Sequence, residues 1–276
     1  MTESFLAEVM KLRRRPAMWV LLSLWFAMAL AFGYLIPYLV YQNPPNGGAG
    51  IDSQQLLASL VPAGWLGNVV SGFPLFGAAM VLIAGILVVG SEFGWNTMGT
   101  VMTQRPRRLE VLSGKLGALA VLVALFELVV FAPGALASAI IARALDAPVD
   151  WPHAAEMLRV FAGGFLILGA WAAIGVALAV LFRSTALPVG LGLVWLLVIE
   201  SLVNGFGDQL RALGSLRQAL PGTTGGSLAA SFASNLPDTP GVSAVTGPVQ
   251  AVVVLLVWSI VPVVLASVFL RRRDVT

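Results

Sequence analysis

Residues 91–115, SEFGWNTMGTVMTQRPRRLEVLSGK, form a polar island between two long apolar stretches. The island carries six charged residues, whereas the stretch before it, residues 69–90, carries none. An uncharged apolar stretch of about 18 residues or more is typical of a membrane-spanning helix. The island therefore indicates a polar connection, outside the hydrocarbon, between two spans of a membrane protein.

The composition supports this interpretation. Of 276 residues, 58% are hydrophobic and 11% are charged, and the mean hydropathy is +0.91. A soluble domain carries about 25% charged residues, so the chain is predicted to be a multi-pass membrane protein. The chain has a net charge of +3, and its excess basic residues lie at the edges of apolar stretches, which argues against a nucleic-acid partner. The chain has no Cys, which excludes disulfides, thiol catalysis and Cys-based metal sites.

Six stretches are long enough to cross about 30 Å of hydrocarbon as helices. They are apolar throughout rather than alternating, which favours helices over barrel strands, and we expect an all-α integral membrane protein with a single transmembrane domain over residues 1–276. The predicted spans are residues 16–41, 65–90, 116–142, 160–182, 184–204 and 249–270. The polar island, 91–115, joins the second and third spans, and a long loop, 205–248, joins the fifth and sixth.

The basic residues predict the orientation. With six spans both termini lie on one side, and that side holds twelve of the 16 Lys and Arg residues, including those of the island. The positive-inside rule places this side, with both termini, in the cytoplasm. We expect the chain in the cytoplasmic (inner) membrane of a bacterium.

Two further helical regions are expected outside the spans. Residues 1–15 predict an amphipathic helix at the membrane surface, because Phe5, Val9 and Leu12 share one face while Glu8 and Lys11 are polar. A frayed tail is the alternative for so short a segment. In the loop 205–248, a stretch of small and apolar residues predicts re-entrant or interfacial helices on the outer side.

The chain has no catalytic motif. It lacks G-x-x-x-x-G-K-[ST], G-x-S-x-G and H-E-x-x-H, and its single histidine, His153, is expected to be a solvated loop residue. We therefore expect no enzymatic activity, no metal site and no cofactor in the chain itself.

Two acidic residues fall within predicted spans. Glu127 lies near the middle of the third span, where an ionised carboxylate costs several kcal/mol unless it faces a cavity or a partner. It is either an acid of the substrate pathway or gate, or a protonated side chain bonded to a neighbouring helix. Glu200 lies near the outer end of the fifth span, which favours a structural or outer-gate role.

The island itself has helical spacing. Trp95, Met98 and Met102 share one face of a helix, and Pro106 predicts a break at Arg105. This spacing predicts a short amphipathic helix at the cytoplasmic surface, followed by a basic segment that leads into the third span. A solvated connector anchored to lipid headgroups is the alternative.

These features resemble the membrane subunits of type-2 ABC exporters. The resemblance rests on the order of residues in and near the island, and on the run from Glu8 to Pro16, E-x-x-K-L-R-R-R-P, which is similar to the family's elbow helix. The matching residues of the island are Glu92-Phe93, Trp95, Thr97, Met102-Thr103, Arg105-Pro106, Arg108 and Gly114-Lys115.

The resemblance implies that the chain is a permease of an ATP-driven exporter for a hydrophobic or amphipathic substrate, such as a drug, a peptide antibiotic or a lipid. It implies two copies of the permease, or one copy with a paralogue, and two separate ATPase subunits that bind ATP and Mg. The island would be the coupling helix that contacts an ATPase. The implied coupling residues are Glu92, Phe93, Trp95, Thr97, Thr100, Arg105 and Arg108.

Two other classes of function stay open at this stage. A secondary transporter that needs no ATPase would have internal repeats and broken helices, and no clear repeat is found. A membrane enzyme or assembly factor is disfavoured by the missing catalytic residues.

Overall fold

The computed structural model describes residues 2–44, 52–94, 108–207, 211–233, 237 and 239–272. These residues are helical apart from short connections, and none of them forms a strand. The all-α prediction is therefore confirmed for the described part of the chain.

The part of the chain up to Gly94 contains the first two spans, and both are interrupted by short helices of other types. The chain begins with helix α1 (Thr2–Arg14), and Arg15 separates α1 from the first span. The elements that follow are α2 (Pro16–Leu30), η1 (Ala31–Leu35), α3 (Ile36–Gln42), α4 (Ser53–Leu60), η2 (Pro62–Gly64), α5 (Trp65–Ser71), η3 (Phe73–Gly77) and α6 (Ala78–Gly94).

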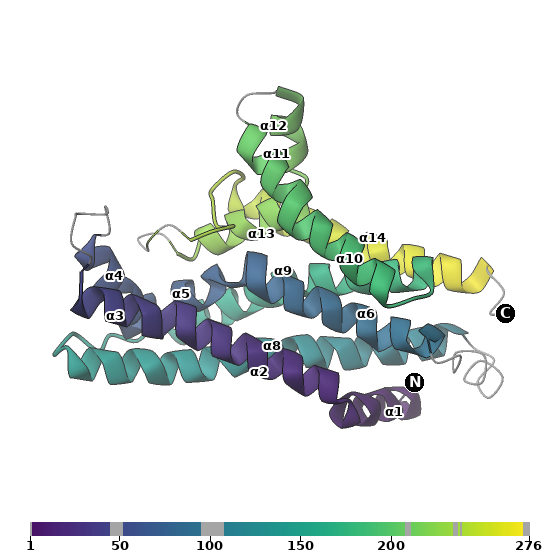
Figure 1. Ribbon diagram of the computed structural model, residues 1–276, viewed down its shortest axis with the longest axis horizontal. Coiled ribbons are helices and arrows are strands. Elements are labelled where there is room, and N and C mark those ends of the chain that lie inside the picture. Colours follow the sequence, from purple (N-terminus) through teal and green to yellow (C-terminus); the bar gives the residue numbers. More distant parts are fainter. Residues whose placement is uncertain are drawn as a thin grey trace.

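The described chain after Gly94 contains the two longest described helices, α8 and α9. The elements are α8 (Arg108–Ala144), α9 (Ala154–Phe182), α10 (Ala186–Val194), η4 (Trp195–Ile199), α11 (Glu200–Phe206), α12 (Arg211–Arg217), α13 (Pro221–Ala230) and α14 (Pro248–Arg272). In Figure 1 both ends of the chain lie on the right-hand side, toward which α6 and α14 also run.

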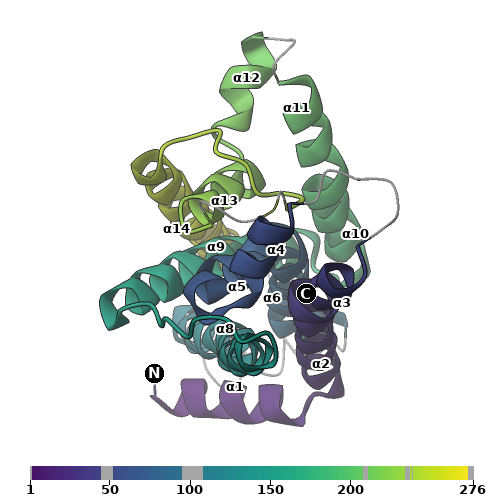
Figure 2. The same ribbon diagram turned by 90° about the vertical axis from the view of Figure 1, so that its left-hand side faces the viewer.

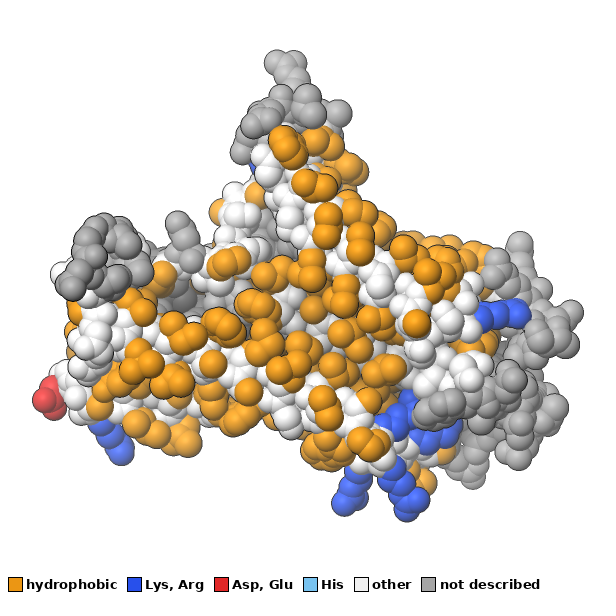
Figure 3. All heavy atoms as spheres, in the orientation of Figure 1, with side chains coloured by type: hydrophobic (Ala, Val, Ile, Leu, Met, Phe, Trp, Pro, Cys, Tyr) orange, Lys and Arg blue, Asp and Glu red, His pale blue; other side chains and the backbone are white. Residues whose placement is uncertain are grey.

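Six helical stretches among the described residues are long and apolar enough to cross a membrane, as the sequence predicts. They are Pro16–Gln42, Pro62–Gly94, Glu110–Ala144, Ala154–Phe182, Ala186–Phe206 and Pro248–Arg271. The face drawn in Figure 3 is covered by hydrophobic side chains along the bundle, and most of its Lys and Arg side chains gather near the end at which α1 lies.

The core lies between α6 and α9. Two glycines bring the two helices into backbone contact, because a Cβ atom on Gly85 would overlap the carbonyl oxygen of Ala172, and one on Gly175 would overlap that of Leu82. Small residues serve the same purpose in many membrane helix pairs. The second span is accordingly the most buried, at 67% of its window, whereas the first, fifth and sixth are 22%, 28% and 17% buried.

Helix α1 lies across the bundle rather than along it, as Figure 2 shows in a view along the long helices. The break has a local cause, since Arg15 is extended and Pro16 occupies the first position of α2, where its missing N–H costs nothing. The predicted amphipathic N-terminal helix is thus present, and it packs against the first turns of α8.

Two helices lie in the long loop between the fifth and sixth spans. Helix α12 stands beside α11 on the part of the molecule that projects from the bundle (Figure 1), whereas α13 is buried along almost its whole length. Glycine, serine and threonine predominate in α13, which lets it fit among the larger elements around it.

Candidate functional site

The island of the sequence is only partly described by the structure. Glu92 and Phe93 belong to the last turn of α6, and Arg108 begins α8. Four of the predicted coupling residues lie outside the described residues: Trp95, Thr97, Thr100 and Arg105. What the structure does describe is the base of the island, where the chain leaves α6 and enters α8.

Four charged side chains meet at this base. Lys11 Nζ lies 2.8 Å from Glu8 Oε1 and 3.0 Å from Glu92 Oε1. Lys115 Nζ lies 3.1 Å from Glu8 Oε1 and 2.7 Å from Glu92 Oε1. Each ammonium therefore contacts both carboxylates, and we call these four residues the charge ring. The ring joins three elements: α1, the end of α6 and the start of α8.

The ring is largely buried. The side chain of Lys115 is 1% exposed, and those of Glu92 and Glu8 are 4% and 7% exposed, whereas that of Lys11 is 39% exposed. Opposite charges balance within the ring, which is the condition under which buried ions are tolerated. Lysine suits this position because its compact ammonium group has three donors that can reach two carboxylates at once.

Local packing holds α1 in place for these contacts. Glu8 and Lys11 are three residues apart and so lie on the same side of α1. On α8, Gly114 leaves room for α1, because a Cβ atom there would lie 2.8 Å from the Cβ of Ser4. Arg15, at the junction of α1 and α2, donates a 2.9 Å hydrogen bond from Nη1 to the carbonyl of Leu87 in α6.

Lys11, the most exposed member of the ring, has a raised pKa. Burial lowers the pKa of Lys11, but hydrogen bonds to Glu8 and Glu92, together with the negative charge of both carboxylates, raise it, so that it lies above its ordinary value of 10.5. Lys11 therefore keeps its positive charge throughout the physiological pH range.

The sequence did not predict this ring. It placed Glu8 and Lys11 on the polar side of an interfacial helix, and Lys115 at the entry to a span. One signal was present, since Lys11 and Lys115 are the only lysines in the chain and every other basic side chain is an arginine. The carboxylate of Glu92, a predicted coupling residue, contacts two lysines of its own chain.

Glu127 lies in the middle of the bundle, on α8, and is fully buried. Neither of its carboxylate oxygens has a hydrogen-bond partner among the described residues. Its neighbour on α9 is Gly164, where a Cβ atom would overlap Glu127 Oε1 and lie 2.6 Å from the ring of Phe73. The backbone of Phe165, on α9, is the polar group that interacts with Glu127. The sequence predicted either a functional acid or one bonded to another helix, and both roles stay open.

Glu200 is also buried, but it has partners. Its Oε1 accepts hydrogen bonds from the backbone N–H of Gly222, at 2.9 Å, and from the indole of Trp195, at 3.2 Å. Its Oε2 accepts one from the N–H of Thr223, at 3.0 Å. These two backbone groups belong to the first turn of α13, where N–H groups have no partner within the helix. These contacts join the start of α11 to the start of α13, and the structural and outer-gate roles both remain predictions.

The three acidic residues singled out in the sequence lie at three different places in the structure. Glu92 lies in the charge ring, Glu127 in the middle of the bundle, and Glu200 at the N-terminus of α13. Among the described residues, no three Asp, Glu or His side chains lie close enough together to hold a metal ion.

The comparison with known families gives one match. The sequence model described as "ABC-2 family transporter protein" matches residues 4–200, which include α1, the charge ring and Glu127. A comparison with curated proteins gave no significant match.

Proposed function

The chain belongs to the ABC-2 family of transporter proteins and is a membrane permease component of an ABC transporter, and from this premise we propose that it forms the pathway of an ATP-driven exporter. The family implies association with ABC ATPase subunits. In the proposed complex two ATPase subunits bind ATP and Mg, and they contact residues 95–107 on the cytoplasmic side of a bacterial inner membrane.

The observation that carries this proposal is the charge ring. Within the island, α6 ends at Gly94 and α8 begins at Arg108. The ring ties these two helices to each other through the 2.7 Å contact of Lys115 with Glu92. The same ring ties both helices to α1. A force applied to the island by an ATPase would therefore move α6, α8 and α1 together rather than bend a loose connection.

In this proposal Glu92 and the island have different tasks. Trp95, Thr97, Thr100 and Arg105 make the contact with the ATPase, together with Phe93 and Arg108 at the two ends of the island. Glu92 is 3% exposed and contacts Lys11 and Lys115. It acts as a positioning residue that passes the motion to the helices.

A second permease, either a copy of this chain or a paralogue, completes the pathway. Support comes from the three least buried spans, which are 17–28% buried and carry many exposed large hydrophobic side chains. Apolar faces of this kind suit lipid or another permease, and a pathway built from them suits a hydrophobic or amphipathic substrate.

Glu127 is the proposed acid of this pathway. A carboxyl group without a partner is costly in the middle of a membrane span, which makes such residues functional by default. Its packing against Gly164 implies that separation of α8 and α9 would expose it. Glu127→Gln keeps the size of the side chain and removes its charge, so we expect it to reduce transport while the spans stay folded.

The test begins with an affinity-tagged chain purified from its native membrane. An ABC ATPase should copurify, and purification without one would contradict the proposal. In that complex Trp95→Ala or Glu92→Gln should leave ATP hydrolysis in place but reduce the vanadate-dependent change in the distance between spin labels on α6 and α9. Glu156→Gln, an exposed residue at the far end of α9, is the matched control. Full coupling in both test variants would refute the role of the island and the ring.

A further inference from the structure

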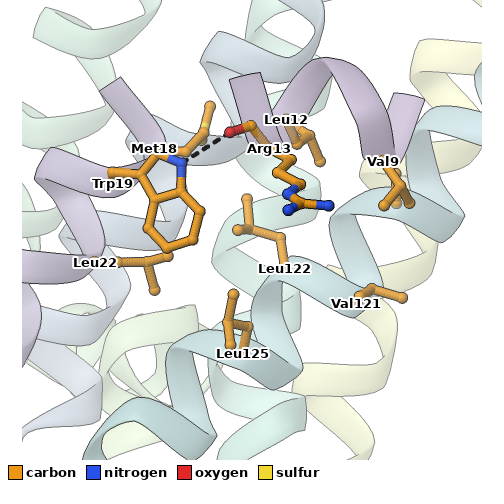
Figure 4. A pocket seen from close by; sticks show the side chains of 10 residues that line it. Val9, Leu12, Arg13, Met18, Trp19, Leu22, Val121, Leu122 and Leu125 are labelled. Carbon is orange, nitrogen blue, oxygen red and sulfur yellow. Dashed lines mark hydrogen bonds between the residues drawn. The ribbon is translucent and has the colours of Figure 1, made fainter. Parts of the chain in front are cut away.

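A pocket of about 240 Å³ lies where α1, α2 and α8 meet. It arises because the chain bends at Arg15, so that α1 and α2 diverge while α8 closes the space between them. In Figure 4 the side chains of Trp19, Leu122 and Val121 face this space, and Arg13 extends across it from α1.

The lining is apolar apart from one charge. The indole N–H of Trp19 donates a 2.9 Å hydrogen bond to the carbonyl of Arg13, so the ring turns hydrocarbon toward the pocket. The volume is below the range of about 300–1,000 Å³ that is usual for drug-sized ligands. A narrow, flexible hydrocarbon chain fits such a space better than a ring system.

Arg13 supplies the charge at the mouth of the pocket. Its side chain is exposed, and no ion pair joins it to another described residue. Arg14, beside it, is also exposed and likewise has no ion pair with the described residues. One guanidinium group at the mouth of an apolar pocket, with a second on the next residue of α1, complements a ligand with an anionic head and a hydrocarbon tail.

The surroundings of the pocket place it at the edge of the membrane. The first span begins at Pro16, immediately after the arginines. Around the pocket Trp19 and Val121 are 53% and 50% exposed, and on α1 Leu6 and Met10 are 58% and 60% exposed. Exposed apolar side chains beside exposed arginines are typical of a helix at the boundary between headgroups and acyl chains.

We propose that this pocket binds one anionic phospholipid, with an acyl chain in the pocket and the phosphate on Arg13 and Arg14. The lipid is a bound component of the permease rather than its cargo. It would hold α1 against α8 from the side opposite to the protein core. Because Leu12 and Ala118, which line the pocket, lie next to Lys11 and one turn from Lys115, the lipid would also steady the charge ring.

Binding can be measured on the chain alone by native mass spectrometry with added phosphatidylglycerol or phosphatidylcholine. We expect one phosphatidylglycerol to be retained in preference to phosphatidylcholine, and excess inorganic phosphate not to displace it. Arg13→Gln should lower that retention about fivefold, which is the effect of one basic side chain at a membrane surface. Arg143→Gln, an exposed arginine in the last turn of α8, should leave it unchanged.

A second measurement locates the acyl chain. Phosphatidylglycerol with a brominated acyl chain should quench the fluorescence of Trp19, taken as the difference from Trp19→Phe. Ala118→Leu, which fills the pocket, should abolish that quenching while the melting temperature shows a folded chain. Equal retention of both lipids, no effect of Arg13→Gln, or full quenching in Ala118→Leu would each overturn the proposal. Both measurements are made on the chain without an ATPase, so their outcome is independent of the test of the proposed function.

Discussion

Replacing Lys115 by methionine tests the charge ring most directly. The change keeps the length of the side chain but removes the ammonium group that contacts Glu8 at 3.1 Å and Glu92 at 2.7 Å. Two carboxylates that are 7% and 4% exposed then keep Lys11 as the remaining lysine of the ring. Breaking a buried ion pair by removing one partner costs about 3–5 kcal/mol.

The lower end of that range applies, because Lys11 still contacts both carboxylates. A loss of about 3 kcal/mol corresponds to about a hundredfold change in an equilibrium constant. The cost should appear mainly as undocking of α1 from α8, because α6 is also held by its backbone contact with α9. Hydrogen exchange by mass spectrometry should therefore show faster exchange, by up to about a hundredfold, in the peptide that covers residues 2–14.

A double variant makes the reasoning refutable. Glu92→Gln combined with Lys115→Met restores neutrality, and we expect it to exchange more slowly in α1 than Lys115→Met alone. Lys115→Arg should not restore the wild-type rate, because a planar guanidinium does not fit a site built for a compact ammonium. Arg143→Met serves as the control in the same helix. Unchanged exchange in Lys115→Met, or additive effects in the double variant, would show that the ring does not hold α1.

Three other predictions concern single positions. Gly164→Ala should destabilise the bundle by about 1–3 kcal/mol, because the new methyl group overlaps Glu127. Gly169→Ala, in the same helix, should not destabilise it, because nothing lies within 4 Å of the new methyl group. Equal melting temperatures of the two variants would contradict this prediction. Glu200→Ala should loosen α13 by about 1–3 kcal/mol, seen as faster hydrogen exchange there, whereas Glu200→Gln, which keeps an acceptor, should cost less. The raised pKa of Lys11 means that its stabilisation is complete below pH 10.5, its unfolded value, and is lost as pH rises through the folded value. Above pH 10.5 the melting temperature should fall more steeply for wild type than for Lys11→Met, and parallel curves would argue against the contribution.

The spans were predictable because each depends on its own residues. About 20 consecutive apolar residues are required for a crossing, and the six predicted stretches overlap the six found. The predicted ends differ most at the starts of the third and fourth spans, which begin at Glu110 and Ala154 rather than at 116 and 160. The second span begins at Pro62 rather than at 65 and continues to Gly94 rather than to 90. Turns that contain Pro62 and Pro74 are helical in the second span, in 3-10 and π form.

The charge ring was not predictable, because it depends on contacts between distant segments. Glu8 and Lys115 are 107 positions apart, and Lys11 and Glu92 are 81 apart. Helical spacing shows which side of a helix a residue occupies but not what that side faces. The partners of Glu200 escaped prediction for the same reason, since its ligands are backbone N–H groups that become available only once α13 has formed.

The separation of the ring's members along the chain also sets an order in time. Helix α1 is made before α8, and Lys115, against which it docks, is made 107 residues after Glu8. At about 5–20 residues per second, the ribosome needs about 5–20 seconds to supply it. During this interval α1 lacks its contact surface on α8, and its exposed Leu6 and Met10 can hold it on the lipid surface. Docking of α1 is thus a late event of synthesis. It requires that the second and third spans are inserted so that Glu92 and Lys115 lie beside α1.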